Sequence, residues 1–291
     1  MVYNISMKIE HLLESEQATA VFDRFLPGMR KMAEGNPQAK QLSVEQLIRY
    51  TRLPQGAELL LRLDEALRAL NTPENAISPS EAKLIKRFRD IAAADAARAP
   101  APENHHQDAV YPGQPWLDTR GERIQAHGGG IFYADGIYYW YGENKEHTDG
   151  KNGVWTWGIK VYSSTDLYNW TDRGFLIPPV LDDPNSALFP TKRIDRPHIL
   201  KCEATGKYVC WIKLSGPEAA FTIWKADHLL GPYEMVENLY NPGGHKAGDF
   251  DLIADSETGK GYLYFDADHS AMLCMELTDD YLHAKREAAR S

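Results

Sequence analysis

Four carboxylates stand where strand-like segments of this sequence begin or end. Glu143 closes an otherwise apolar run, where a carboxylate is costly unless it lines a polar site. Asp195 precedes Arg196, which can pair with it or donate to a ligand hydroxyl. Asp249 and Asp251 are two residues apart, so they face the same side of a strand. Carboxylates give and take protons, so this set suits acid–base chemistry.

Three hairpin-like repeats carry these carboxylates. Each repeat has two apolar runs separated by a turn signal, at Asp135-Gly136, at 205–207 and at 258–260. More strand-like sequence follows each hairpin, so each unit of about 50 to 70 residues reads as about four short strands. Three related units predict blades of a β-propeller, and a β-sandwich with similar hairpins is the alternative.

The amino-acid sequences of these repeats resemble glycoside hydrolase family 43, in particular its galactan-directed and its galactofuranose- or arabinofuranose-directed subfamilies. That resemblance implies a five-bladed β-propeller, with only about three blades present over roughly residues 116–283. The segments that carry the resemblance are WLDT (116–119), IQAHGGGIFYADGIYYWYGENK (124–145), VYSSTDLYNW (161–170), IDRPHILKCEATGKYVCWI (194–212), GDFDLIADSETGKGYLY (248–264) and LTDDYL (277–282).

The resemblance also implies roles for the carboxylates. It makes Asp249 the residue that tunes the pKa of the general acid, with Asp251 as the alternative. It makes Glu143 a substrate-contacting carboxylate, although a surface position at a strand end is the plainer interpretation. Asp195, Arg196 and Pro197 resemble the family's acidic-Arg-Pro triplet at the mouth of the axis, where a purely structural ion pair is equally compatible with the sequence.

Two parts of the family pattern are missing. His127 occupies the place of the usual Asp base, as in the galactan-directed subfamilies, and is expected to bind sugar hydroxyls or a structural ion on the axis. The three glycines at 128–130 would let the backbone approach that axis closely. The general acid belongs early in the next blade, and Glu287 is only faintly similar to its motif.

We expect the substrate-binding residues to be His127, Arg196, Asp251 and two aromatic platforms, Trp140 and Tyr141. Trp116, Trp155 and Trp157 are further aromatic candidates, although aromatic residues in strands are more often core. Glycosidase chemistry runs on carboxylates, so no metal or other cofactor is required for catalysis.

The first hundred residues have a different character. All seven Trp lie after residue 110, and the early segments show apolar spacing of three to four residues. The apolar positions from Ile9 to Phe25 predict one helix, and Ser43 with Gln46 predicts a capping box that opens a later helix. We therefore predict a multidomain α and β protein: a helical accessory bundle of about four helices over 1–97, a Pro- and Ala-rich linker over 98–115, and propeller blades over 116–291. Asn36 to Ser43 is expected to form the turn of a helical hairpin.

Charge and composition exclude several classes. The net charge of −9 and a pI near 5.6 argue against nucleic acid and anionic membranes as partners. The first residues lack a signal-peptide pattern, and the unpaired spacing of Cys202, Cys210 and Cys274 favours buried free thiols, so a cytoplasmic location is expected.

Two functions remain after these exclusions. The first is a glycoside hydrolase acting on β-1,3-galactan, galactofuranosyl or arabinofuranosyl bonds of an oligosaccharide or polysaccharide. The second is a catalytically inactive propeller fragment that binds carbohydrate or forms oligomers. An open propeller exposes sheet edges, so a second copy of the chain, the helical unit or another partner is expected to cover them, unless the sequence is incomplete.

Overall fold

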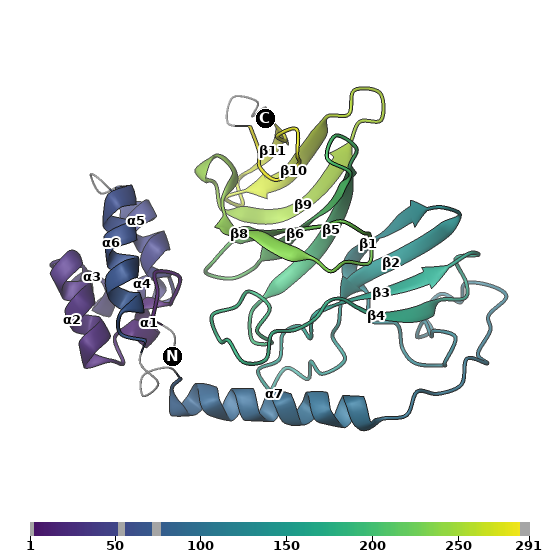
Figure 1. The fold of residues 1–291 in the computed structure, drawn as a ribbon, viewed down its shortest axis with the longest axis horizontal. Helices are drawn as coiled ribbons and strands as arrows, with labels where there is room; N and C mark the ends of the chain where they lie inside the picture. The colour runs from purple at the N-terminus through teal and green to yellow at the C-terminus, as the bar shows by residue number, and fades with distance from the viewer. Residues whose placement is uncertain (1–2, 52–55, 72–76, 286–291) are drawn as a thin grey trace. The chain divides into compact units, whose positions relative to one another are not determined.

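The computed structural model describes residues 3–51, 56–71 and 77–285. The chain divides into two compact units (Figure 1). One contains residues 1–93 together with 181–186, and the other contains residues 94–180 and 187–291. The division therefore falls inside the last helix, and the expected linker 98–115 belongs to the second unit.

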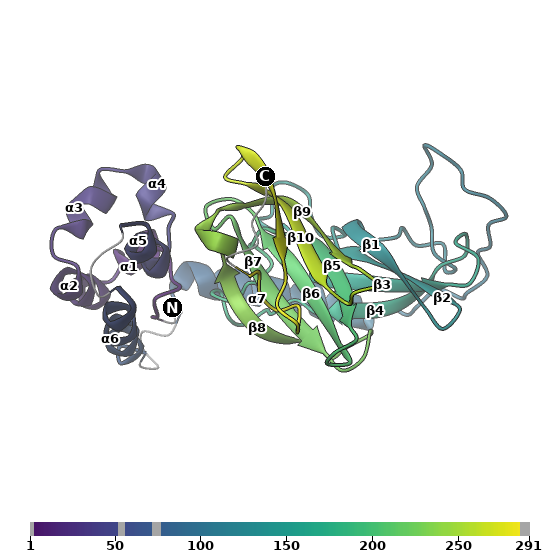
Figure 2. The same ribbon diagram turned by 90° about the horizontal axis from the view of Figure 1, so that it is seen from above.

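Short helices build the first unit. Figure 2 shows these helices from above. The buried core of the unit gathers apolar side chains from different helices, such as Phe22, Leu47 and Leu63. Among the described helices, none combines the length and the apolar character that a membrane crossing requires. The helices are α1 (Ile9–Leu12), α2 (Glu16–Phe25), α3 (Met29–Glu34), α4 (Pro37–Lys40), α5 (Val44–Thr51), α6 (Gly56–Arg68) and α7 (Pro79–Ala97).

Capping residues set where these helices begin. Ser43 and Gln46 form the expected capping box, with Gln46 N donating to Ser43 Oγ at 3.0 Å and Ser43 N donating to the Gln46 side chain at 2.9 Å. The expected helix over 9–25 is divided, because Ser15 accepts from Ala18 N and starts α2 afresh. The expected turn at 36–43 contains a one-turn helix, α4, capped by Asn36.

Three antiparallel sheets build the second unit, as the repeats predict. In two sheets neighbouring strands follow chain order, β1-β2-β3-β4 and β5-β6-β7-β8, and in the third β10 lies between β9 and β11. The third sheet has three described strands, one fewer than expected. The strands are β1 (His127–Ala134), β2 (Ile137–Glu143), β3 (Ile159–Ser164), β4 (Thr171–Ile177), β5 (Ile194–Cys202), β6 (Lys207–Leu214), β7 (Ala220–Ala226), β8 (Glu234–Tyr240), β9 (Ala247–Ala254), β10 (Gly261–Ala267) and β11 (Ala271–Glu276).

The expected hairpin turns join the first two strands of each sheet. Asp135 and Gly136 both have positive φ, 51° and 81°, as a two-residue hairpin turn with the twist of the strands requires. The turn sets Ala134 opposite Ile137 and carries the pairing up to Gly130 opposite Tyr141. A bulge between His127 and Gly130 then re-aims the start of β1.

The sheets pack face to face. The first and second sheets enclose a core that includes Ile159, Ile199 and Ile212, and the second and third enclose one that includes Trp211, Phe221 and Phe265. The opening strand of the second sheet, β5, lies against β1 on one side and β9 on the other (Figure 1). The arrangement is a partial β-propeller that follows a helical region, which confirms the expected fold class.

Candidate active site

The carboxylates expected from the sequence meet at one end of the three sheets. His127 begins β1 and pairs with Glu143 at the end of β2. Asp195 is the second residue of β5, and Asp249 is the third residue of β9. Because β1, β5 and β9 lie side by side, these positions form one cluster of polar side chains.

Glu143 lies at the centre of this cluster and is fully buried. Its Oε1 accepts from Arg196 N at 2.9 Å and lies 3.3 Å from His127 Nδ1. Its Oε2 lies 2.6 Å from Lys145 Nζ, an ion pair by distance whose angles fall outside hydrogen-bond geometry. A buried carboxylate needs such partners, so Glu143 fixes the backbone of β5 and the position of Lys145.

Asp249 is the carboxylate with the most cationic surroundings. Its Oδ1 accepts from Lys213 Nζ and from Arg196 Nε, both at 2.8 Å. The hydrogen bond from Lys213, reinforced by the charge of Arg196, holds the pKa of Asp249 below its usual value against the opposing effect of partial burial. Asp249 is therefore an ionised, half-exposed carboxylate at neutral pH.

Asp195 faces an indole from the loop that joins β2 to β3. Its Oδ1 accepts from Trp155 Nε1 at 2.8 Å, and Lys145 Nζ lies 3.9 Å away. Two cations lie over the indole ring of Trp155. Lys145 Nζ is 5.0 Å from the ring centroid, and Arg193 Cζ is also 5.0 Å from it. Trp155 is 36% exposed, so part of its ring is open to a ligand.

The glycines at the start of β1 allow the backbone to pass close to this cluster. Gly128 has φ 62°, and a Cβ there would lie 2.7 Å from Glu143 Oε1. At Gly129 a Cβ would lie 1.9 Å from the carbonyl oxygen of Tyr141. The expectation that these positions need glycine for close approach therefore has a steric basis.

Asp251 lies on the same side of β9 as Asp249, as the two-residue spacing predicts. Both side chains are exposed while Phe250 between them is buried. Asp251 Oδ1 lies 3.2 Å from His198 Nδ1 in β5. Burial lowers the pKa of His198 in spite of the nearby carboxylate.

Two of the expected sugar platforms are in the wrong place for that role. Tyr141 is 4% exposed, and its hydroxyl accepts a hydrogen bond from Ile199 N across the boundary between the first two sheets. Burial raises the pKa of that hydroxyl, which stays neutral. Trp140 packs edge-on between Trp116 and Trp170. Both residues therefore hold the sheet together, and Trp155 is the aromatic side chain that the cluster presents.

Two lysines of the cluster were not expected from the sequence. Lys145 follows Glu143 by two residues, and Lys213 lies in the apolar strand β6 with a side chain 12% exposed. The sequence feature that could have indicated Lys213 is its position within an apolar strand. A buried ammonium group needs a carboxylate partner, so a lysine there points to a polar site. The partner, Asp249, is 36 residues away and is found only by folding.

The expected ion near His127 has no ligand set in the described part of the chain. There, no group of three or more His, Cys, Asp or Glu side chains is arranged to hold a metal. His127 is exposed and contacts Glu143. Glu287, the faint candidate for the acid, lies outside the described residues.

The arrangement of the three sheets is similar to that of several solved glycosidases. A family 43 β-1,3-galactosidase matches with a TM-score of 0.54 and 27% identity over 62% of this chain. A candidate exo-β-1,3-galactanase from Bifidobacterium bifidum matches with a TM-score of 0.52 and 30% identity over 58% of this chain. The three sheets are blades of a glycoside hydrolase family 43 propeller. The resemblance expected from the sequence is thereby confirmed.

An exo-β-1,3-galactanase from Phanerochaete chrysosporium, solved with β-1,3-galactotriose, shares these family 43 blades. It matches with a TM-score of 0.57 and 25% identity over 64% of this chain. The chain spans 38%, 54% and 42% of the lengths of these three structures, in the order given. No protein-family model matches the sequence, and a comparison with curated proteins gives no match.

Proposed function

We propose that this protein is a glycoside hydrolase that cleaves β-galactosyl bonds, with β-1,3-linked galactosaccharides as its substrates. The observation that carries the proposal is the cluster at the strand ends. There Asp195 accepts from an exposed indole, Trp155, and the next residue, Arg196, pairs with Asp249, on family 43 blades. Aromatic faces and charged hydrogen-bonding groups together are what a sugar ring requires.

In this proposal Asp249 has an electrostatic role. Hydrolysis of a glycosidic bond needs a carboxylic acid that protonates the leaving oxygen and a base that activates water. Lys213 and Arg196 keep Asp249 ionised, so it does not itself supply the proton. A fixed negative charge raises the pKa of a neighbouring carboxylic acid, which is the effect that a general acid needs at neutral pH.

The other groups bind and orient the sugar. Arg196 Nη atoms and Asp195 offer donors and an acceptor to sugar hydroxyls, and Trp155 offers a ring face. Glu143 is buried, so it acts as a positioning residue that holds Arg196 N and Lys145 in place. A galactosyl ring bound here would contact side chains from all three sheets.

The second candidate is a module that binds galactosaccharides without cleaving them. One observation favours it: each of the four carboxylates in the cluster is already engaged by a cation or an N–H donor. Asp249 pairs with Lys213, Glu143 with Lys145, Asp251 with His198, and Asp195 accepts from Trp155. Carboxylates engaged in this way can accept hydrogen bonds from sugar hydroxyls without taking part in proton transfer, which is all that binding requires.

Galactose release and saccharide binding, measured on the same samples, test the proposal. We expect the protein to release galactose from β-1,3-galactotriose. Trp155→Ala should weaken binding about tenfold, equivalent to ~1.4 kcal/mol, and Asp249→Asn should lower kcat more than it changes KM. Tyr168→Ala is the matched control, because Tyr168 is 39% exposed in the turn between β3 and β4, away from the cluster.

The outcomes separate the two candidates. Binding that depends on Trp155, without any galactose release, would replace the hydrolase with the binding module. If galactotriose neither binds nor is cleaved, or if Trp155→Ala and Tyr168→Ala behave alike, the cluster is not a galactoside site. Thermal unfolding of each variant distinguishes loss of the site from loss of the fold.

A further inference from the structure

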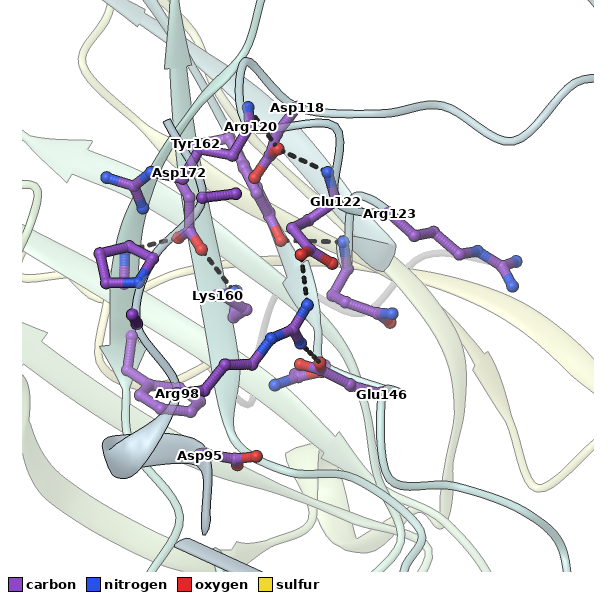
Figure 3. Close-up of a pocket in the computed structure, with 17 residues that line it drawn as sticks. Asp95, Arg98, Asp118, Arg120, Glu122, Arg123, Glu146, Lys160, Tyr162 and Asp172 are labelled. Carbon is purple, nitrogen blue, oxygen red and sulfur yellow. Dashed lines mark hydrogen bonds and ion pairs between the residues drawn. The ribbon is translucent and has the colours of Figure 1, made fainter. Parts of the chain in front are cut away.

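A second polar cavity lies in the propeller unit, on the first sheet. Its volume is about 390 Å³, within the range of small-molecule sites. Strands β3 and β4, the segment 118–125 and the stretch 95–101 line it (Figure 3). Glu143, Asp195, Arg196 and Asp249 are not among its described lining residues, so it is distinct from the candidate active site.

Five of the charged side chains that line this cavity pair with one another. Lys160 Nζ lies 2.6 Å from Asp172 Oδ2, and Arg98 forms ion pairs with Glu122 and Glu146 (Figure 3). The lining holds four basic and five acidic side chains. An anionic ligand would therefore meet an excess of carboxylates and cations that are already engaged, which disfavours phosphate and uronate groups.

The other charged side chains of the lining have contacts of different kinds. Asp95 Oδ2 lies 2.8 Å from His147 Nε2, and an Arg120 guanidinium nitrogen lies 2.8 Å from Glu103 Oε1. Asp118 is 3% exposed, and its Oδ1 accepts from the backbone N–H of Arg120 and Glu122 at 2.9 and 3.0 Å. The guanidinium of Arg123 points away from the other labelled side chains (Figure 3). No cation of the lining is therefore left to recognise a negative charge inside the cavity.

Neutral hydrogen-bond donors do remain. Gln125 Oε1 accepts from Lys145 N, and Asn144 Oδ1 accepts from Glu146 N. The amide nitrogens of these two side chains donate to none of the residues that the structure describes. Both side chains line the cavity. Each therefore keeps an N–H₂ group for an uncharged oxygen such as a hydroxyl.

The cavity also has an exposed aromatic wall. Phe175 lines it and is 41% exposed, although an aromatic ring usually gains by burial. The hydroxyl of Tyr162 accepts from Gln125 N at 3.0 Å, and burial raises the pKa of Tyr162 to about 12, so this hydroxyl stays neutral. An open ring face beside amide and hydroxyl groups matches a ring that has apolar faces and a polyhydroxyl edge.

We propose that this cavity is a second saccharide-binding site, specific for a neutral sugar ring. The preference for a neutral polyhydroxyl ligand follows from the cavity's own residues. The choice of a galactosaccharide as the sugar rests on the function proposed above. Gln125 of the cavity accepts from Lys145 N of the candidate active site, so a protein with both sites would hold a polysaccharide chain beside the candidate active site and increase the local concentration of substrate there.

An NMR titration of the ¹⁵N-labelled full chain with β-1,3-galactobiose tests the proposal. Amide signals around Gln125, Asn144 and Gly174 report the cavity, and those around Asp195 and Asp249 report the active-site cluster. We expect separate dissociation constants for the two groups. Phe175→Ala should raise the Kd of the cavity about tenfold, equivalent to ~1.4 kcal/mol, and leave the Kd of the cluster unchanged.

Two further variants make the result specific. Gln125→Glu keeps the acceptor for Lys145 N, removes the free donors and adds a negative charge, so it should weaken binding at the cavity even if Phe175→Ala failed to fold. Tyr168→Ala is the matched aromatic control and should change neither Kd. A titration with inorganic phosphate should shift no cavity signals.

The possible failures are distinguishable. If galactobiose shifts the cluster signals and leaves the cavity signals unchanged, the second site is wrong and the proposed function stands. If it shifts only the cavity signals, and Phe175→Ala abolishes the shift, the second site stands without the proposed function. Phosphate binding at the cavity, or unchanged galactobiose binding in both cavity variants, would overturn the neutral-sugar assignment.

Discussion

Arg196 Nε lies 2.8 Å from Asp249 Oδ1, and this ion pair joins β5 of the second sheet to β9 of the third. Arg196 also donates its backbone N–H to Glu143 of the first sheet, from a left-handed conformation with φ 52°. One residue therefore connects all three sheets at the candidate active site. A conformation of this kind costs of order 1–3 kcal/mol and persists where surrounding contacts enforce it.

The contribution of Asp249 to stability should depend on pH. Its folded-state pKa is depressed from 3.8 by Lys213 and Arg196, so the contribution is present above about pH 4 and is lost as the pH falls through the folded-state value. Asp249 is half-exposed, so solvent screening limits the effect to about 1 kcal/mol or less. Thermal unfolding between pH 7 and pH 2 should show Asp249→Asn less stable than wild type at neutral pH and equal to it in acid. Parallel curves over the whole range would contradict this.

Gly128 should be far less tolerant of alanine than Gly136. Both have positive φ, 62° and 81°, which costs alanine about 1 kcal/mol in either place. At Gly136 a Cβ meets nothing within 4 Å, whereas at Gly128 it would lie 2.7 Å from Glu143 Oε1. Urea unfolding should therefore show Gly128→Ala at least about 1 kcal/mol less stable than Gly136→Ala. Equal losses of unfolding free energy in the two variants would mean that Glu143 and its neighbours can shift to accommodate the added methyl group without destabilising the fold.

The turns and caps could be predicted because their signals are local. Asp135-Gly136 joins two strands since both positions accept positive φ. Ser43 and Gln46 reach each other across a single helical turn. The division of the first helix at Ser15 does not follow from the apolar spacing, because that spacing continues across Ser15. The signal for a new helix there is the N-cap serine, whose side chain accepts from Ala18 N.

The contacts of the candidate site could not be predicted in the same way. Asp249 meets Lys213 and Arg196 only because three sheets pack together, and periodicity within one strand does not report that. The sequence also does not show which face of the sheet an aromatic residue of β2 occupies. Apolar side chains follow one another in the run IYYWYGE and occupy both faces. Tyr141 was therefore assigned to the sugar, whereas it bonds to Ile199 N in the core.

Trp155 should contribute both a ring face and a hydrogen bond. Trp155→Phe keeps an aromatic ring and removes the donor that serves Asp195 at 2.8 Å. We expect a loss of galactotriose affinity of about threefold for Trp155→Phe, smaller than that of Trp155→Ala, because a partly exposed hydrogen bond contributes modestly. Isothermal titration calorimetry on the two variants measures both losses. Equal losses would show that the ring of residue 155 does not contact the sugar.

The ion pair between Lys145 and Glu143 should be strongly coupled, because Glu143 has no exposed surface. Removing one partner of a buried pair leaves an uncompensated charge, whereas removing both does not. Lys145→Met in the wild-type background should cost about 2–3 kcal/mol, at or below the lower end of the range for buried pairs because Lys145 is 24% exposed.

The same change in the Glu143→Gln background should cost much less. A glutamine at this position still accepts from Arg196 N, and the bonds of Lys145 Nζ to Trp155 O and Thr156 Oγ1 are lost in both backgrounds, so they cancel in the cycle. Urea unfolding of the four proteins gives the coupling energy. A value near zero would show that Lys145 is held by the loop carbonyl and hydroxyl, and Glu143 would then owe its buried position to Arg196 N and His127.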